Sequence, residues 1–175
     1  VTAHSSAMVI DLQAAIAIFH NDPRVYNFLS YLICGGMLLA AAVQILRKQF
    51  SPRSAWLALA AVSALTMLVT YHKPWDAKLL LLTIPACAML STEGKKIQWM
   101  ALLVTASGLI FTGDIPLGIL TVIADHQHLG TTSFLEKLKT VLLIRPASMM
   151  LVVVAIFYLW MLLRRTDSNP VHEEG

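Results

Sequence analysis

Long apolar runs separated by short polar turns dominate this sequence. Five runs are rich enough in leucine, alanine, valine and isoleucine to form membrane-spanning helices, at about 28–46, 54–70, 75–91, 97–113 and 147–163. A spanning α-helix needs about 20 mainly apolar residues, because each residue rises about 1.5 Å through a hydrocarbon core about 30 Å thick. The pattern therefore predicts an all-α fold, a polytopic transmembrane helical bundle of about five spans.

The third run is the least regular of the five. Its uninterrupted apolar part covers only 79–90, so a full crossing requires a helix that begins near Trp75 and ends near Ser91. Lys78 would then extend its side chain back to the membrane interface. Pro85 lacks a backbone N–H, and we expect a kink in the helix there.

Small residues indicate where helices approach closely, because small side chains let two backbones pack together in lipid. The first span contains Gly35–Gly36 and Ala40–Ala42, and the second carries Ala60 and Ala64 on one face. We expect close helix contacts at these positions. The aromatic residues of the last span, Phe157, Tyr158 and Trp160, are interpreted as lipid-facing or packing residues.

Three segments lie outside the predicted spans. Residues 1–27 contain an amphipathic helix that the stretch from His20 to Pro23 would close, and we expect it on the outer membrane surface or against another domain. Residues 114–146 form an outer loop whose short apolar part suits an interfacial or re-entrant segment. Residues 166–175 predict a disordered cytoplasmic tail.

The composition agrees with a membrane location. The 175 residues are 57% hydrophobic and 13% charged, whereas a soluble domain carries about 25% charged residues. Basic residues form short clusters at the ends of apolar runs, which disfavours nucleic-acid binding. Cys34 and Cys87 lie inside apolar runs without metal-ligand spacing, and the pair His126 and His128 is no metal signature alone. We predict no metal site and no cofactor.

The basic clusters also predict an orientation. Arg47–Lys48, Arg53, Lys95–Lys96 and Arg164–Arg165 fall on one side of a five-span bundle, while basic residues on the other side are spread over longer loops. Because cytoplasmic loops are enriched in Lys and Arg, we expect the dense clusters and the C-terminus to be cytoplasmic. A re-entrant third run would place the last two clusters outside, against this rule.

The stretch YHKPWDAK, residues 71–78, has two interpretations. In the structural one, Pro74 ends one helix, Asp76 caps the next, and the aromatic and basic side chains lie at the membrane interface. In the functional one, His72, Lys73 and Lys78 form a cationic patch for a phosphate or pyrophosphate on a lipid anchor. Asp76 would orient a lysine or contact a sugar hydroxyl.

The same stretch resembles glycosyltransferase family 87, bacterial polytopic enzymes related to polyprenyl-phosphate-mannose-dependent mannosyltransferases. A Tyr-His-basic-x-x-Asp-x-Lys-Leu-Leu pattern recurs in that family, and it is matched here by Tyr71, His72, Lys73, Asp76, Lys78, Leu79 and Leu80. The segments 22–27 and around Asp114 also resemble family members. The similarity extends from about Asp11 to Arg165.

The resemblance implies the C-terminal part of a C-type glycosyltransferase-like fold in the bacterial inner membrane. Such an enzyme moves a hexose, here expected to be mannose, from a polyprenyl-phosphate donor to an acceptor on the outer face. The family carries its catalytic aspartate in an early outer loop, so we expect further N-terminal spans to supply it and this chain to be inactive alone. The motif residues Tyr71, His72, Lys73, Asp76 and Lys78 are implied to contact the donor. No catalytic residue is assigned, and a metal requirement stays open.

Two alternatives stay open. In a non-catalytic transporter or channel-type subunit, Pro85 and the short third run would mark a broken helix that lines a site at the membrane midplane. Ion paths usually carry intramembrane charge, whereas the deepest polar residues here, Thr66, Thr83 and Thr105, are uncharged, which favours the enzyme. A lipid-linked polymer ligase or flippase would also need outward basic residues.

Overall fold

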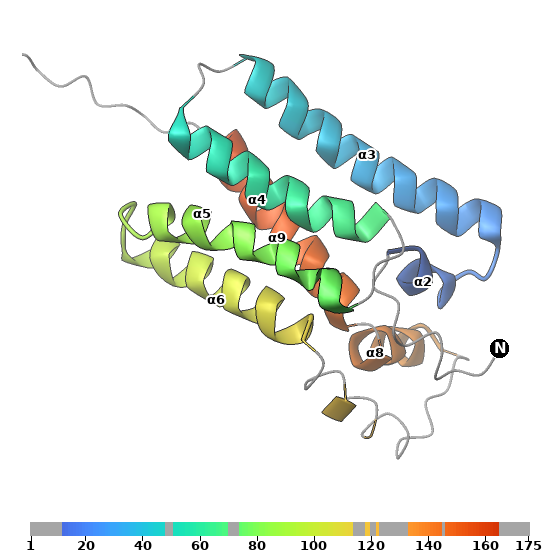
Figure 1. Ribbon diagram of the computed structural model, residues 1–175. Coiled ribbons are helices and arrows are strands. Elements are labelled where there is room, and N and C mark those ends of the chain that lie inside the picture. The colour runs from blue at the N-terminus through green and yellow to red at the C-terminus, as the bar shows by residue number, and fades with distance from the viewer. Residues whose placement is uncertain are drawn as a thin grey trace, which may run out of the picture.

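The computed structural model in Figure 1 describes residues 12–47, 51–69, 74–113, 118–119, 122, 133–144 and 146–164. Every regular element within these ranges is a helix, which confirms the all-α prediction for the described part of the chain. The elements are α2 (Leu12–Ala17), α3 (Pro23–Arg47), α4 (Pro52–Val69), the 3-10 helix η1 (Pro74–Leu82), α5 (Thr83–Leu90), α6 (Lys95–Phe111), α8 (Phe134–Ile144) and α9 (Pro146–Leu163).

Three of the described helices, α3, α4 and α9, are long and apolar enough to cross a membrane. They coincide with the first, second and fifth predicted spans. The stretch Lys78–Leu90 is a shorter apolar helix, and α6 has 17 residues. The chain therefore carries three candidate spans by length and composition, and the other two predicted crossings stay a prediction.

Proline residues begin α3 and α4, so Pro23 starts a helix in addition to following the one that it was predicted to close. Asp22 caps α3, because its Oδ1 accepts a hydrogen bond from the Arg24 N–H at 2.9 Å. Pro23 takes the first helical position, where no N–H donor is required. At α4, Ser51 precedes Pro52 and its Oγ accepts a bond from the Ser54 N–H at 3.1 Å. The helix α3 thus begins earlier than the predicted 28–46 span.

The helices α4 and α9 pack against each other and form the centre of the bundle, with α5 and α6 on one side and α3 on the other (Figure 1). In the apolar 18-residue stretch of α3, only 17% of the residues are buried, compared with 50% in the corresponding stretch of α4 and 61% in that of α9. Because α3 is peripheral, most of its apolar side chains are exposed. Successive long helices run in opposite directions (Figure 1).

The small residues of α4 and Ala41 of α3 are buried as predicted, but the glycine pair of α3 makes no close contact. Ala60 and Ala64 are fully buried in the helix that packs against α9. At Gly35 and Gly36, by contrast, a Cβ atom would meet no described atom within 4 Å. The closest approach at a described glycine is at Gly108 of α6, where a Cβ would lie 2.7 Å from Val154 Cγ2 of α9.

The described part of the amphipathic segment before α3 packs against the bundle. Leu12 and Ala15 of α2 are buried, and α2 contacts α3, α4 and α9. The Phe19 ring lies 5.6 Å from the ring of Phe134 in α8, and Lys137 Nζ donates to the Phe19 carbonyl at 3.1 Å. The segment carrying α2 and the helix α8 therefore lie together at one end of the bundle.

Candidate functional site

The structure describes only part of the predicted donor site. Tyr71, His72 and Lys73 lie outside the described residues, and so does the side chain of Asp76. Lys78 lies in η1 with its side chain exposed. The convergence of the five predicted residues on one ligand stays a prediction.

The backbone at Asp76 differs from the predicted one. The 3-10 helix η1 begins at Pro74, so Asp76 is its third residue and does not precede it. The helix that follows, α5, is preceded by Leu82 without a side-chain capping bond. Asp76 therefore does not take the backbone position before the helix that the predicted cap requires, because proline takes the first position of the helix.

Pro85 also has a different consequence from the predicted kink within a long α-helix. The chain changes from 3-10 to α geometry between Leu82 and Thr83, so Pro85 falls in the first turn of α5. A missing N–H is tolerated in a first turn. Thr83 supports the change, since its Oγ1 donates to the Leu80 carbonyl at 2.5 Å.

Buried hydrogen bonds connect Thr83, at the start of α5, to the helices α9 and α6. The hydroxyl of Tyr158 in α9 donates to the Thr83 carbonyl at 3.2 Å and lies 2.6 Å from Thr105 Oγ1 in α6. Because a tyrosine hydroxyl has one proton, Thr105 must be the donor in the second bond. The three groups satisfy one another, and no charged side chain is buried in the described ranges. The arrangement is therefore suited to holding helices together and not to acid–base chemistry.

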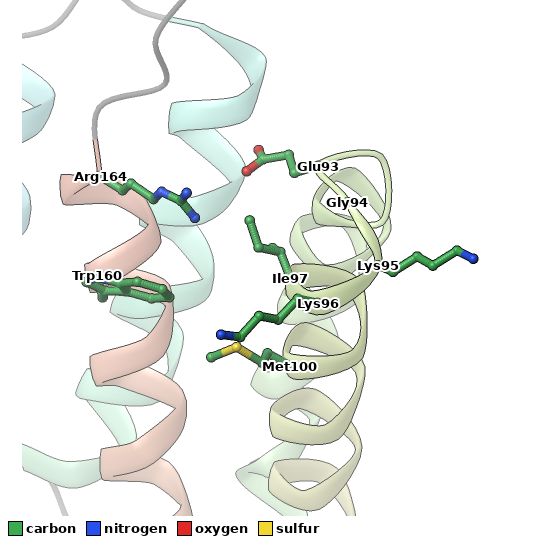
Figure 2. Close-up of a pocket in the computed structure, with 8 residues that line it drawn as sticks. All are labelled: Glu93, Gly94, Lys95, Lys96, Ile97, Met100, Trp160 and Arg164. Atoms are coloured by element: carbon green, nitrogen blue, oxygen red, sulfur yellow. The ribbon is translucent and has the colours of Figure 1, made fainter.

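A basic groove lies at the end of the bundle where α6 begins and α9 ends (Figure 2). Its volume is about 630 Å³. Lys96 points toward α9, Lys95 points away from it, and Arg164 extends from the end of α9 toward the turn before α6 (Figure 2). The Arg164 guanidinium carbon lies 5.8 Å from the centre of the Trp160 ring.

The turn at the edge of this basic groove is anchored by an ion pair. Arg53 at the start of α4 forms two hydrogen bonds to the carboxylate of Glu93, at 2.5 and 3.1 Å. Both side chains are about four-fifths buried, with 23% and 21% exposed. The pair connects the start of α4 to the turn before α6.

Sequence reasoning used Lys95, Lys96 and Arg164 only to orient the chain and did not recognise the basic groove. Lys95 and Lys96 begin a helix whose first turn contains no acidic residue, which the helix dipole disfavours. That unfavourable position was a usable signal. The sequence contained no signal that Lys96 and Arg164 line the same groove, because this depends on how α6 packs against α9.

No group of three or more potential metal ligands from His, Cys, Asp and Glu occurs in the part of the chain that the structure describes. His126 and His128 lie outside that part. Comparisons of the chain with family models, with curated proteins and with solved structures found no match.

Proposed function

We propose that this chain forms the C-terminal membrane portion of a glycosyltransferase that uses a polyprenyl-phosphate sugar donor. The transferred sugar is a hexose, with mannose as the expected one, and the acceptor lies on the outer face of the bacterial inner membrane. The observation that carries the proposal is the cluster of ionisable residues in 71–78, immediately before an apolar helix. Membrane lipid and the lipid-linked donor are the proposed partners.

The geometry of η1 and α5 supports a full third crossing. A 3-10 helix rises about 2.0 Å per residue and an α-helix about 1.5 Å. The nine residues of η1 therefore extend about 18 Å and the eight of α5 about 12 Å. Together they match a hydrocarbon core about 30 Å thick when Lys78 extends its side chain back to the membrane interface. With α6 as the fourth, the bundle has five crossings.

The positions of the basic residues support the proposed orientation. The exposed Lys78 belongs to η1, which starts near the end of the bundle that carries α2 and α8 (Figure 1). Lys96 belongs to the start of α6 and Arg164 follows α9, and these helix ends lie at the other end of the bundle. In a five-span bundle the dense basic end is cytoplasmic. The motif then faces outward, at the level where a lipid-phosphate headgroup is presented.

Labelling of single cysteines tests this topology. In a chain with Cys34 and Cys87 replaced by alanine, Lys73→Cys should react with a membrane-impermeant maleimide on intact cells. Lys95→Cys should react only after the membrane is permeabilised, because the crossing formed by η1 and α5 separates the two positions. The measurement is the fraction of protein modified under each condition. Labelling of both positions from the same side contradicts the five-span arrangement.

The proposed chemistry is displacement at the anomeric carbon of the sugar, with the lipid phosphate as leaving group. His72, Lys73 and Lys78 would offset the negative charge that develops on the departing phosphate. Tyr71 would contact the donor at the interface, and Asp76 would orient a lysine or bind a sugar hydroxyl. The base that activates the acceptor is proposed to come from N-terminal spans of the same protein.

Donor affinity tests the role of the two lysines. The double variant Lys73→Gln/Lys78→Gln should bind polyprenyl-phosphate-mannose in nanodiscs at least tenfold more weakly. A hydrogen bond to a charged group contributes about 1.5 kcal/mol, and about 1.4 kcal/mol corresponds to a tenfold change in affinity. Lys139→Gln is the matched control, since Lys139 is an exposed lysine of α8. Unchanged donor affinity in the double variant would sink the proposal.

The transporter alternative finds support in one feature, the change of helix type at Thr83 within the third apolar run. Broken helices in transporters line a solute site near the membrane midplane. At Thr83, however, the neighbouring hydroxyls of Tyr158 and Thr105 bind protein groups and not a solute. The enzyme is therefore the function that we favour.

A further inference from the structure

The basic groove at the opposite end of the bundle has no part in the proposed sugar transfer. Among the described residues, three cationic side chains, those of Lys95, Lys96 and Arg164, and one carboxylate, that of Glu93, line the basic groove. Both oxygens of that carboxylate accept hydrogen bonds from Arg53. The basic groove therefore has an excess of positive charge that favours an anion.

The start of α6 adds backbone donors to this charge. Gly94 precedes the helix without a side-chain capping bond, and the first backbone bond made to it is from the Gln98 N–H to the Gly94 carbonyl at 3.0 Å. The N–H groups of Lys95, Lys96 and Ile97 precede that bond and have no partner within the helix. They point along the helix axis in the direction where an anion is favoured.

The walls of the basic groove are apolar and continue toward the middle of the bundle. Ile97 and Met100 of α6 and Trp160 of α9 line it together with the charged groups (Figure 2). On α9, Val153, Ile156 and Trp160 are spaced by three and four residues and are 44%, 53% and 45% exposed. Residues at this spacing share one helix face. An exposed apolar stripe thus leads away from the basic end.

We propose that the basic groove binds an anionic phospholipid, with its phosphate between Lys96 and Arg164 and an acyl chain along the α9 stripe. The location fits a lipid, because Trp160 and Arg164 lie in and directly after the last turn of a candidate membrane span. Tryptophan is enriched at the headgroup level of membranes, and basic pockets between spanning helices bind anionic headgroups. The site would hold the bundle at a fixed depth in the anionic leaflet.

Quenching of Trp160 fluorescence by brominated lipid tests this site without any transfer reaction, so its outcome is independent of the proposed glycosyltransferase activity. Phenylalanine replaces Trp56, Trp75 and Trp99, and the full chain is reconstituted in phosphatidylcholine vesicles. Brominated phosphatidylglycerol should quench Trp160 at a lower mole fraction than brominated phosphatidylcholine does. We expect a preference of about fivefold for each of the two cationic side chains, from the attraction of a basic residue to an anionic membrane surface. Addition of inorganic phosphate should leave this preference unchanged.

Variants separate charge from packing. Lys96→Gln/Arg164→Gln should abolish the preference for phosphatidylglycerol, whereas the charge-preserving pair Lys96→Arg/Arg164→Lys should keep most of it. Lys139→Gln, on α8, should leave the preference unchanged. Native mass spectrometry of the unmodified chain in mixed lipids provides a second measurement, with selective retention of phosphatidylglycerol expected. Equal quenching by the two lipids, no effect of the glutamine pair, or displacement by inorganic phosphate would overturn the proposal.

Discussion

Replacement of Gly108 by leucine should lower the free energy of unfolding by about 3 kcal/mol, at the upper end of the cost of overpacking a close contact. A Cβ at position 108 would lie 2.7 Å from Val154 Cγ2, well inside the optimal carbon–carbon separation of about 3.5 to 4.0 Å. Val154 is buried and β-branched, so it has essentially one side-chain rotamer in a helix and cannot turn away. The helix α6 would have to move away from α9.

Reversible unfolding in mixed micelles, followed by circular dichroism, measures this effect. Gly35→Leu is the matched control, because no described atom lies within 4 Å of a Cβ at that position. It should change the stability by less than about 0.5 kcal/mol, as surface substitutions do. The smaller substitution Gly108→Ala should be better tolerated in a Val154→Ala chain, which lacks the opposing methyl group. Equal costs for leucine at positions 35 and 108 would contradict the observed packing.

Replacement of Tyr158 by alanine should be comparably destabilising, at about 3 kcal/mol, the lower end of the cost of removing a large buried aromatic side chain. Tyr158 is fully buried, and its ring lies 5.2 Å from that of Phe157. Its hydroxyl also connects α9 to Thr105 of α6 and to the Thr83 carbonyl. Alanine would leave a cavity and remove both hydrogen bonds.

Tyr158→Phe separates the two contributions. It keeps the ring and should cost about 1 kcal/mol, because interhelical hydrogen bonds in membranes contribute about 0.6 kcal/mol on average and at most about 1.7. Most of that cost should disappear in a Thr105→Val chain, where the partner hydroxyl is already absent. Tyr31→Ala, at a tyrosine that is 56% exposed, is the control and should have little effect on unfolding. A larger loss at Tyr31 than at Tyr158 would contradict the described core.

The two sites belong to the same contact between α6 and α9. Thr105 and Gly108 are one turn apart on α6, and Tyr158 and Val154 are one turn apart on α9. The two helices run in opposite directions. Thr105 therefore contacts Tyr158, and one turn further along, Gly108 contacts Val154. Together with the buried Ala101, these small side chains form a close-packed stripe on α6. Substitutions at both sites should therefore show non-additive costs.

Small residues predicted close contacts in both α3 and α4, and the glycine pair of α3 was misleading. Gly35–Gly36 predicted a close contact, yet α3 is peripheral and its glycines meet no described neighbour within 4 Å of a Cβ. The spacing of Ala101, Thr105 and Gly108 was less conspicuous, but it marks the closest glycine contact that the structure describes. Small residues permit the close approach of another helix, but which helix approaches depends on the packing of the whole bundle.

For the candidate sites, sequence reasoning reached the motif at 71–78 and missed the basic groove. The motif is contiguous, so its ionisable residues are visible as a group in the chain. The basic groove is lined by both Lys96 and Arg164, which are far apart in sequence and share one groove only because α6 and α9 lie side by side. A site formed by neighbouring residues can be recognised from a sequence. A site formed by residues of two different helices can be recognised only when the packing of those helices is known.

The sequence alone determined that this protein is helical and apolar, because an apolar run of sufficient length satisfies its own backbone hydrogen bonds only as a helix in lipid. It also contained the signals for the helix starts at Asp22–Pro23 and Ser51–Pro52. Only the tertiary structure decided that α4 and α9 are central, that Gly108 meets Val154, and that a basic groove lies between α6 and α9. The physical reason is that periodicity identifies the faces of one helix, while the partner of each face depends on the packing of all helices together.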